Sequence, residues 1–157
     1  MATNHCQTDP KNPLQLMLPS DHSPHPVLEM DELWRFVGSK NNPVWIWLAL
    51  ETKSGRIVSI AFGDRSEQMA QQIYDRLHSY YQKHGIFFTD AWKSYPVLPV
   101  DQPFAVNRST NHMERFNATL RQRCSKLVRK TLSFSKSFTM HQHRILHFIN
   151  QYNSSSP

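Results

Sequence analysis

The sequence predicts an α/β domain in which a mixed sheet, with three antiparallel strands followed by parallel strands, is flanked by helices. Three observations support this fold class. Apolar stretches at 27–38, 44–51 and 56–62 are separated by short turn signals, the apolar spacing then becomes helical, and a short apolar stretch follows that helix. A strand that follows a helix usually joins the sheet parallel to an earlier strand. With 157 residues, the chain is long enough for one domain with a hydrophobic core.

The first three strands are expected to form an antiparallel meander. In the first strand, alternation places Met30 on one face and Asp31 on the other. The second stretch is apolar on both faces, as is typical of a central strand. The segments Asn41-Asn42-Pro43 and Lys53-Ser54-Gly55 are turn signals, and the second of them predicts a hairpin.

The next segment predicts one helix from Ser66 to Gly85. Met69, Ile73 and Leu77 recur at helical steps, and Ser66 is suited to cap the start of the helix, as Gly85 is suited to cap its end. Residues 86–89 then form a short buried strand.

The rest of the chain predicts a fifth strand at 104–106 and two final helices. Asn111 is expected to cap a helix from about His112 to Lys130, and a last helix spans about Met140 to Tyr152. The predicted order is β-β-β-α-β-α-β-α-α, which places a helix between the fourth and fifth strands. This is the order of the ribonuclease H-like fold, an analogy of topology that does not by itself give a function.

Two tails are expected to flank the domain. Residues 1–26 hold half of the ten prolines and no apolar periodicity, so they predict a flexible Pro-rich tail. Residues 27–153 form the predicted domain, including its basic C-terminal helices, and residues 154–157 are a short tail.

Composition indicates a soluble intracellular protein. The two cysteines, Cys6 and Cys124, allow neither a disulfide framework nor a four-ligand zinc site, which fits a reducing compartment. The polar first ten residues do not resemble a signal peptide. The longest apolar run, 44–50, is too short to cross a bilayer, so no membrane partner is expected.

The charges are distributed unevenly along the chain. Lys and Arg number 18 against 12 Asp and Glu, for a formal net charge of +6. No Asp or Glu follows Glu114, so the C-terminal third is purely cationic, which favours contact with a phosphate backbone. The predicted DNA-binding residues are Arg121, Arg123, Lys126, Arg129, Lys130 and Lys136. A solvated helix face is the alternative interpretation of this basic segment.

Three carboxylates are placed so that they can converge. Asp31 lies within the first strand, Asp90 follows the fourth strand, and Glu114 falls in the first turn of the helix after the fifth strand. If the first and fourth strands are neighbours, Asp31 and Asp90 converge at one edge of the sheet and the helix that carries Glu114 packs across that edge. The repulsion among the three carboxylates then calls for a cation. Oxygen ligands suit Mg²⁺ or Mn²⁺, and two such ions support phosphoryl transfer.

Each carboxylate also has a simpler interpretation. A carboxylate in a strand can face solvent, which is the expectation for Glu29 and Glu32. Asp90 can cap the turn that follows it. Glu114, three residues after Asn111, can complete a capping box. A nearby histidine, His112, can assist at the site or occupy an ordinary surface position.

Local sequence around these residues resembles a known family. The stretches EMDELWRFVG, FFTDAWKSY, NHMERFNATLRQR and RKTLSFSKS resemble the transposases of the bacterial insertion sequence family "one", in the frame that encodes the catalytic half. The similarity runs from about Val27 to Tyr152. The family is of the DDE type, so the resemblance implies that Asp31, Asp90 and Glu114 form its acidic, metal-binding triad, with a short spacing between the last two.

The resemblance also implies the reaction and the partners. The reaction is metal-dependent DNA cleavage and strand transfer at the ends of a mobile element, and Arg121 is the basic residue two helical turns after the glutamate. Such proteins usually combine this half with an upstream zinc-finger and helix-turn-helix product, joined by a translational frameshift. A homo-oligomer on DNA, in the bacterial cytoplasm near the nucleoid, is expected.

Two other functions are compatible with the same residues. One is a structure-selective nuclease of the same fold, which hydrolyses but does not join strands. The other is a catalytically incomplete DNA-binding remnant or regulator, since no recognition region is visible upstream of Val27.

Overall fold

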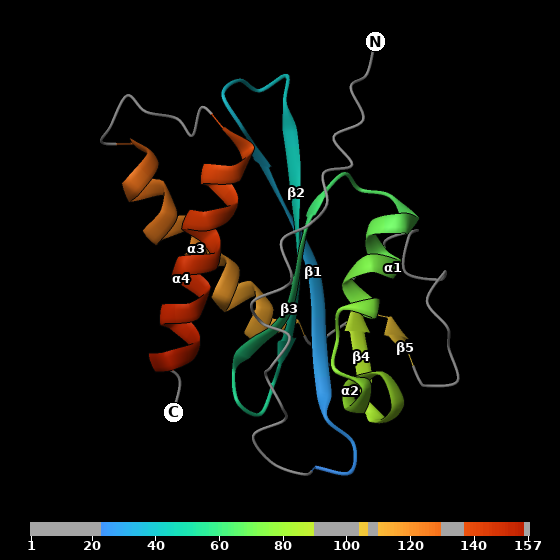
Figure 1. Ribbon diagram of the computed structural model, residues 1–157. Coiled ribbons are helices and arrows are strands. Elements are labelled where there is room, and N and C mark those ends of the chain that lie inside the picture. Colours follow the sequence, from blue (N-terminus) through green and yellow to red (C-terminus); the bar gives the residue numbers. More distant parts are fainter. Residues whose placement is uncertain (1–22, 90–103, 107–109, 130–136, 156–157) are drawn as a thin grey trace.

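The computed structural model describes residues 23–89, 104–106, 110–129 and 137–155. The side chains of 104–106 and 124–129 lie outside this description. Figure 1 shows a central sheet between two layers of helices. The elements, in chain order, are β1 (Val27–Phe36), β2 (Pro43–Glu51), β3 (Arg56–Gly63), α1 (Glu67–Asp75), α2 (Ser79–His84), β4 (Ile86–Thr89), β5 (Phe104–Val106), α3 (Asn111–Arg129) and α4 (Phe138–Ser155).

The sheet has five strands in the order β3-β2-β1-β4-β5. The first three strands pair antiparallel, while β4 is parallel to β1 and β5 is parallel to β4. In the parallel pair, Val27 lies opposite Ile86 and Met30 opposite Thr89. The prediction of a mixed sheet flanked by helices is therefore confirmed, and β1 is the central strand that both halves share.

Each face of the sheet has its own hydrophobic core. On one face, residues such as Leu33 and Ile46 pack with Met113 and Phe116 of α3 and with Ile149 of α4. On the other face, a second cluster is built around buried residues of β1, β2, α1 and α2, among them Met30, Trp47, Ile73 and Tyr81. Figure 1 shows α3 and α4 on one side of the sheet and α1 and α2 on the other.

The predicted single helix from Ser66 to Gly85 is wrong, because the chain forms two helices there. Ser66 does cap α1 by accepting a hydrogen bond from Met69 N, and Gly85 is the C-cap of α2. Between the helices, His78 leaves the helical conformation and its Nδ1 accepts from Tyr80 N at 3.2 Å. This side-chain cap starts a new helix at Ser79.

The ends of the last two helices differ slightly from expectation. Asn111 is the first residue of α3 and not its cap, since Thr110 O accepts the hydrogen bond from Glu114 N. α4 continues to Ser155, two residues into the segment predicted as a tail. The predicted helix between the fourth and fifth strands falls in 90–103, outside the described residues.

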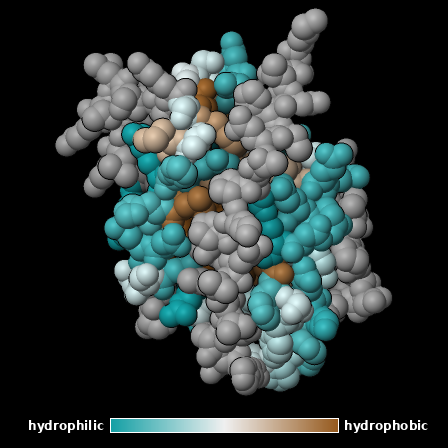
Figure 2. Space-filling view, in the orientation of Figure 1, coloured by the Kyte–Doolittle hydropathy of each residue, from teal (hydrophilic) through white to brown (hydrophobic). Residues whose placement is uncertain are grey.

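The edge strand β3 is closed by a side chain from α4. Asn153, which is 1% exposed, donates to Ile57 O and accepts from Ile57 N, both at 2.9 Å. The amide thus replaces a neighbouring strand at this residue and ties α4 to the sheet. In the view of Figure 2, the described surface is mainly hydrophilic, with hydrophobic residues confined to small areas.

Candidate metal and nucleic acid site

The strand β1 presents Glu29 and Asp31 to the helix α3. They share a face with Leu33, which belongs to the core that α3 and α4 cover. Glu29 is 1% exposed and Glu32 is 7% exposed, so the expectation that both face solvent is wrong. A buried carboxylate is stable only beside hydrogen-bond donors or a cation, and both Glu29 and Glu32 have such partners.

Glu29 holds the start of α3. Its Oε2 accepts from the backbone N–H of Met113 at 2.7 Å, and its Oε1 lies 2.8 Å from His112 Nδ1. The first N–H groups of a helix have no partner within the helix, and a negative charge beside them is favourable. Glu29 supplies a hydrogen-bond acceptor and a negative charge at the start of α3. His112, in the first turn of that helix, is the second partner of this buried carboxylate.

Asp31 contacts α3 one turn further along. Its Oδ2 accepts from Asn117 Nδ2 at 2.7 Å, and its Oδ1 accepts from the backbone N–H of Glu32 at 2.8 Å. Asn117 is 3% exposed, and its own Oδ1 is buried without a hydrogen-bond partner among the described residues. The predicted strand carboxylate therefore lies against the helix that carries Glu114.

Glu114 is exposed in the first turn of α3, three residues before Asn117. Residues three apart on a helix are neighbours on its surface. The carboxylate of Glu114 makes no hydrogen bond or ion pair with the residues that the structure describes, so it does not close a capping box there. Its side chain is left exposed about one helical turn from the contact with Asp31.

Asp90 lies outside the described residues, but the strand that leads to it is described. Thr89 pairs with Met30 in the parallel register, so each is the residue immediately before a predicted triad aspartate. The two described members, Asp31 and Glu114, provide oxygen donors only, which is the donor set that suits Mg²⁺ or Mn²⁺. Within the described ranges, no three His, Cys, Asp or Glu side chains gather closely enough to hold a metal.

Glu32 is engaged on the opposite face of β1. Arg65 Nε donates to Glu32 Oε1 at 2.7 Å, and the Arg65 Nη2 contacts the same oxygen. The Arg65 guanidinium also lies over the ring of Trp45, 4.6 Å from its centroid. Glu32 therefore forms a structural ion pair, and its side chain lies on the opposite face of the sheet from the side chain of Asp31.

The first two predicted DNA-binding residues occupy exposed positions of α3. Arg121 and Arg123 are both exposed. Lys126 and Arg129 belong to α3, but their side chains lie outside the described residues, as do Lys130 and Lys136 entirely. The spacing from Glu114 to Arg121, two turns of a straight helix, keeps both on one side of α3.

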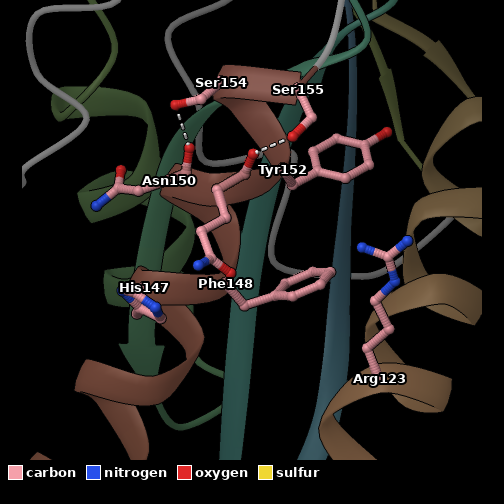
Figure 3. A pocket seen from close by; sticks show the side chains of 8 residues that line it. Arg123, His147, Phe148, Asn150, Tyr152, Ser154 and Ser155 are labelled. Carbon is pink, nitrogen blue, oxygen red and sulfur yellow. Dashed lines mark hydrogen bonds between the residues drawn. The ribbon is translucent and has the colours of Figure 1, made fainter.

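Arg123 also lines a groove between α3 and α4. Figure 3 shows Arg123 of α3 across from Phe148 and Tyr152 of α4, with the Arg123 Cζ 6.0 Å from the Phe148 ring centroid. Among the described residues that line the groove there is no carboxylate; they are Arg123, His147, Phe148, Asn150, Gln151, Tyr152, Ser154 and Ser155. Arg123, which has no acidic partner in the described part of the chain, and the polar side chains of α4 form a surface that suits a polyanion.

A second cationic cluster lies where α4 passes the end of β1. Burial, together with the positive charges of Arg35 and Arg144, lowers the pKa of His141 to about 4. Its Nε2 is buried without a hydrogen-bond partner in the described part of the chain. His141 is therefore neutral at physiological pH.

Comparison with known proteins identifies the family. The chain matches the IS1 transposase family over residues 26–154. This chain belongs to the IS1 transposase family. The matched range begins one residue before β1, ends near the end of α4, and includes Asp31, Asp90 and Glu114. The resemblance inferred from the local motifs is thus confirmed.

Relatives in this family are similar over most of their length. The chain is 35% identical over 127 residues to the insertion element iso-IS1n protein InsB of Shigella dysenteriae, covering 80% of this chain and 95% of that protein. It is 32% identical over 123 residues to the insertion element IS1 protein InsB of Shigella flexneri, covering 78% and 92%. The IS1 4 protein InsB of Escherichia coli K12 is 33% identical over 123 residues, covering 78% and 72%.

None of the described helices of this IS1-family chain is both long and apolar enough to cross a membrane.

Sequence reasoning had placed Asp31 and Glu114 at the site and had missed Glu29 and Asn117. The described part of the site lies on two elements, β1 and α3, which are joined by the contacts of Glu29 and Asp31.

Proposed function

We propose that this IS1-family chain is the catalytic domain of a DNA transposase with a ribonuclease H-like fold, and that Asp31, Asp90 and Glu114 are its metal ligands. The observation that carries the proposal is the contact between Asp31 and Asn117 at 2.7 Å. It joins the central strand to α3 within one turn of Glu114. The parallel register of β4 with β1 also supports it, because it pairs Thr89, the residue before Asp90, with Met30, the residue before Asp31.

The proposed reaction is the one that the family resemblance implies, and the oxygen donor set suits it. Mg²⁺ or Mn²⁺ ions, when bound, activate an attacking oxygen and stabilise the leaving oxygen. A water oxygen attacks a phosphodiester at the element end and the DNA 3′ oxygen leaves. The freed 3′-hydroxyl then attacks a phosphodiester of the target, and its bond to phosphorus replaces the one that breaks there.

Basic residues of α3 would hold the DNA for these steps. Arg121 is exposed two turns after Glu114 on the same side of α3, so its phosphate contact would position a strand beside the carboxylates. Arg123 is exposed on the side of α3 that faces Phe148 of α4, where it would make a separate phosphate contact. Lys126, Arg129, Lys130 and Lys136 would extend this contact along the chain. We expect an upstream zinc-finger and helix-turn-helix product to recognise the element ends, and a homo-oligomer to pair them in the bacterial cytoplasm at the nucleoid.

Amide substitutions test the triad in the full fused protein. Asp31→Asn, Asp90→Asn and Glu114→Gln each keep the side-chain size while removing the charge that binds a cation. Cleavage and joining of element ends with Mn²⁺ should fall by more than about 100-fold in each, since even outer-shell changes at metal sites cost about 10–100-fold. Glu67→Gln, at an exposed position of α1, is the matched control.

The same assay separates the competing functions. Undiminished cleavage in one of the three amide variants would remove that residue from the triad. Nicking without joined products, when a pre-cut end is supplied, would indicate a nuclease. Tight DNA binding without any metal-dependent turnover would indicate a regulator.

A further inference from the structure

A buried carboxylate beside the proposed triad has no part in it. Glu29 precedes Asp31 by two residues on the same face of β1, and it is 1% exposed. Its two oxygens are both occupied by the first turn of α3, one by Met113 N–H and one by His112 Nδ1. The partners come from 84 and 83 residues later in the chain. Glu29 therefore joins two elements that only tertiary folding brings together.

The two carboxylates of β1 form matched contacts with α3. Glu29 meets Met113 and Asp31 meets Asn117. Two residues along a strand span about 6.6 Å, and four residues along a helix span about 6 Å. The two contacts are thus nearly equally spaced on strand and helix, so they fix how far α3 is shifted along β1.

Glu114 lies between these two contacts in the sequence of α3. Together the two contacts restrain α3 against sliding or rotating relative to the strand that carries Asp31. With only the Asp31 contact, the N-terminal turn would lose the partner of a backbone N–H and would be free to fray. We propose that Glu29 is a positioning residue that sets Glu114 relative to Asp31 for metal binding, an inference that rests on the proposed function.

Isosteric variants separate positioning from metal ligation. Glu29→Leu removes both contacts while filling much of the same space. Glu29→Gln keeps an oxygen that can accept from Met113 N–H and an amide that can donate to His112 Nδ1. If Glu29 acts through these hydrogen bonds, the glutamine variant should behave like the natural protein. If its charge binds the metal, the glutamine variant should fail as Asp31→Asn does.

The measurement is Mn²⁺ binding to the full fused protein by titration calorimetry, with hydrogen exchange at 113–117 measured without divalent ion. Glu29→Leu should weaken Mn²⁺ binding by about 10–100-fold, as loss of outer-shell support usually does, and should speed exchange at 113–117. Glu29→Gln should bind Mn²⁺ with nearly the affinity of the natural protein, because its amide keeps both hydrogen bonds. Glu32→Leu is the matched control, because it removes another buried carboxylate of β1, one that pairs with Arg65 on the opposite face of the strand.

The outcomes are distinct. Unchanged Mn²⁺ affinity in Glu29→Leu, with affinity lost in Asp31→Asn, overturns the role of Glu29 and leaves the proposed function standing. Loss in Glu29→Gln equal to that in Asp31→Asn also overturns positioning, because the charge itself is then needed. Unchanged affinity in Asp31→Asn overturns both. If Glu29→Leu does not fold, His112→Ala decides, since it trims an exposed side chain: a severalfold weaker affinity supports positioning and an unchanged affinity overturns it.

Discussion

Replacing Asn117 by aspartate changes one atom of the contact between α3 and β1 and adds a charge. The Asn117 Nδ2 that donates to Asp31 Oδ2 at 2.7 Å becomes an acceptor oxygen that faces another acceptor. Loss of a hydrogen bond to a charged group costs about 2 kcal/mol. Two carboxylates about 4 Å apart repel by about 4 kcal/mol at an effective dielectric of about 20.

Solvent reduces that repulsion, because Asp31 is only partly buried. Taking about half of it, we expect Asn117→Asp to lower the free energy of unfolding by about 4 kcal/mol. For a domain of this size, that loss corresponds to a melting temperature lower by roughly 10–15 °C. Excess Mg²⁺ should raise the melting temperature of the variant more than that of the natural protein, since a cation between carboxylates removes their repulsion.

Thermal unfolding followed by circular dichroism, first in chelator and then with Mg²⁺, measures both effects. Asn150→Asp is the control, because Asn150 is exposed on α4 and the same charge there should change stability by less than about 0.5 kcal/mol. If Asn117→Asp melted in chelator at the same temperature as the control, the carboxamide of Asn117 would not contact Asp31. The contact that joins β1 to the helix carrying Glu114, on which the proposed site depends, would then be refuted.

Three further predictions concern the rest of the domain. The pKa of His141 is lowered to about 4 from its usual 6.5, so the unfolded chain takes up a proton before the folded chain does as the pH falls, and the folded state loses stability. His141→Phe should remove that loss between pH 6.5 and 4, an effect on the order of 1–2 kcal/mol in the free energy of unfolding measured by denaturant titration. Asn153→Leu strands the buried N–H and C=O of Ile57 and should cost about 2–5 kcal/mol in urea unfolding, and a cost below about 0.5 kcal/mol would contradict its edge-closing role. Arg123→Gln should reduce the slope of log affinity for DNA against log salt concentration by about 0.9, because one phosphate contact is lost. Gln151→Ala, in the same groove, should leave that slope unchanged. Equal slopes in the two variants would show that the groove does not contact DNA.

The elements of the fold were readable where local chemistry alone decides them. Ser66 caps α1 because a hydroxyl at that position satisfies a helix N–H two or three residues later, whatever lies around it. The alternation along β1 likewise placed Asp31 and Leu33 on one face correctly. Turn residues between β1, β2 and β3 were enough to indicate a meander.

The break between α1 and α2 could not be found by periodicity. Ile73, Leu77 and Tyr81 are all buried in one core and are spaced by four residues, so an unbroken helix and two helices leave the same apolar pattern. What differs is the conformation of His78, whose ring takes over the role of a capping side chain. Histidine is not among the residues that usually signal a helix start.

The basic segment after Glu114 and the family motifs were visible in the sequence because they are properties of the chain order. The roles of the three acidic residues in β1 were not. Glu29, Asp31 and Glu32 differ only in which distant groups approach them, His112 with Met113, Asn117 and Arg65 respectively. A carboxylate is stable inside a protein only where donors or a cation meet it, and those partners arrive from 33 to 86 residues away when the sheet and helices pack.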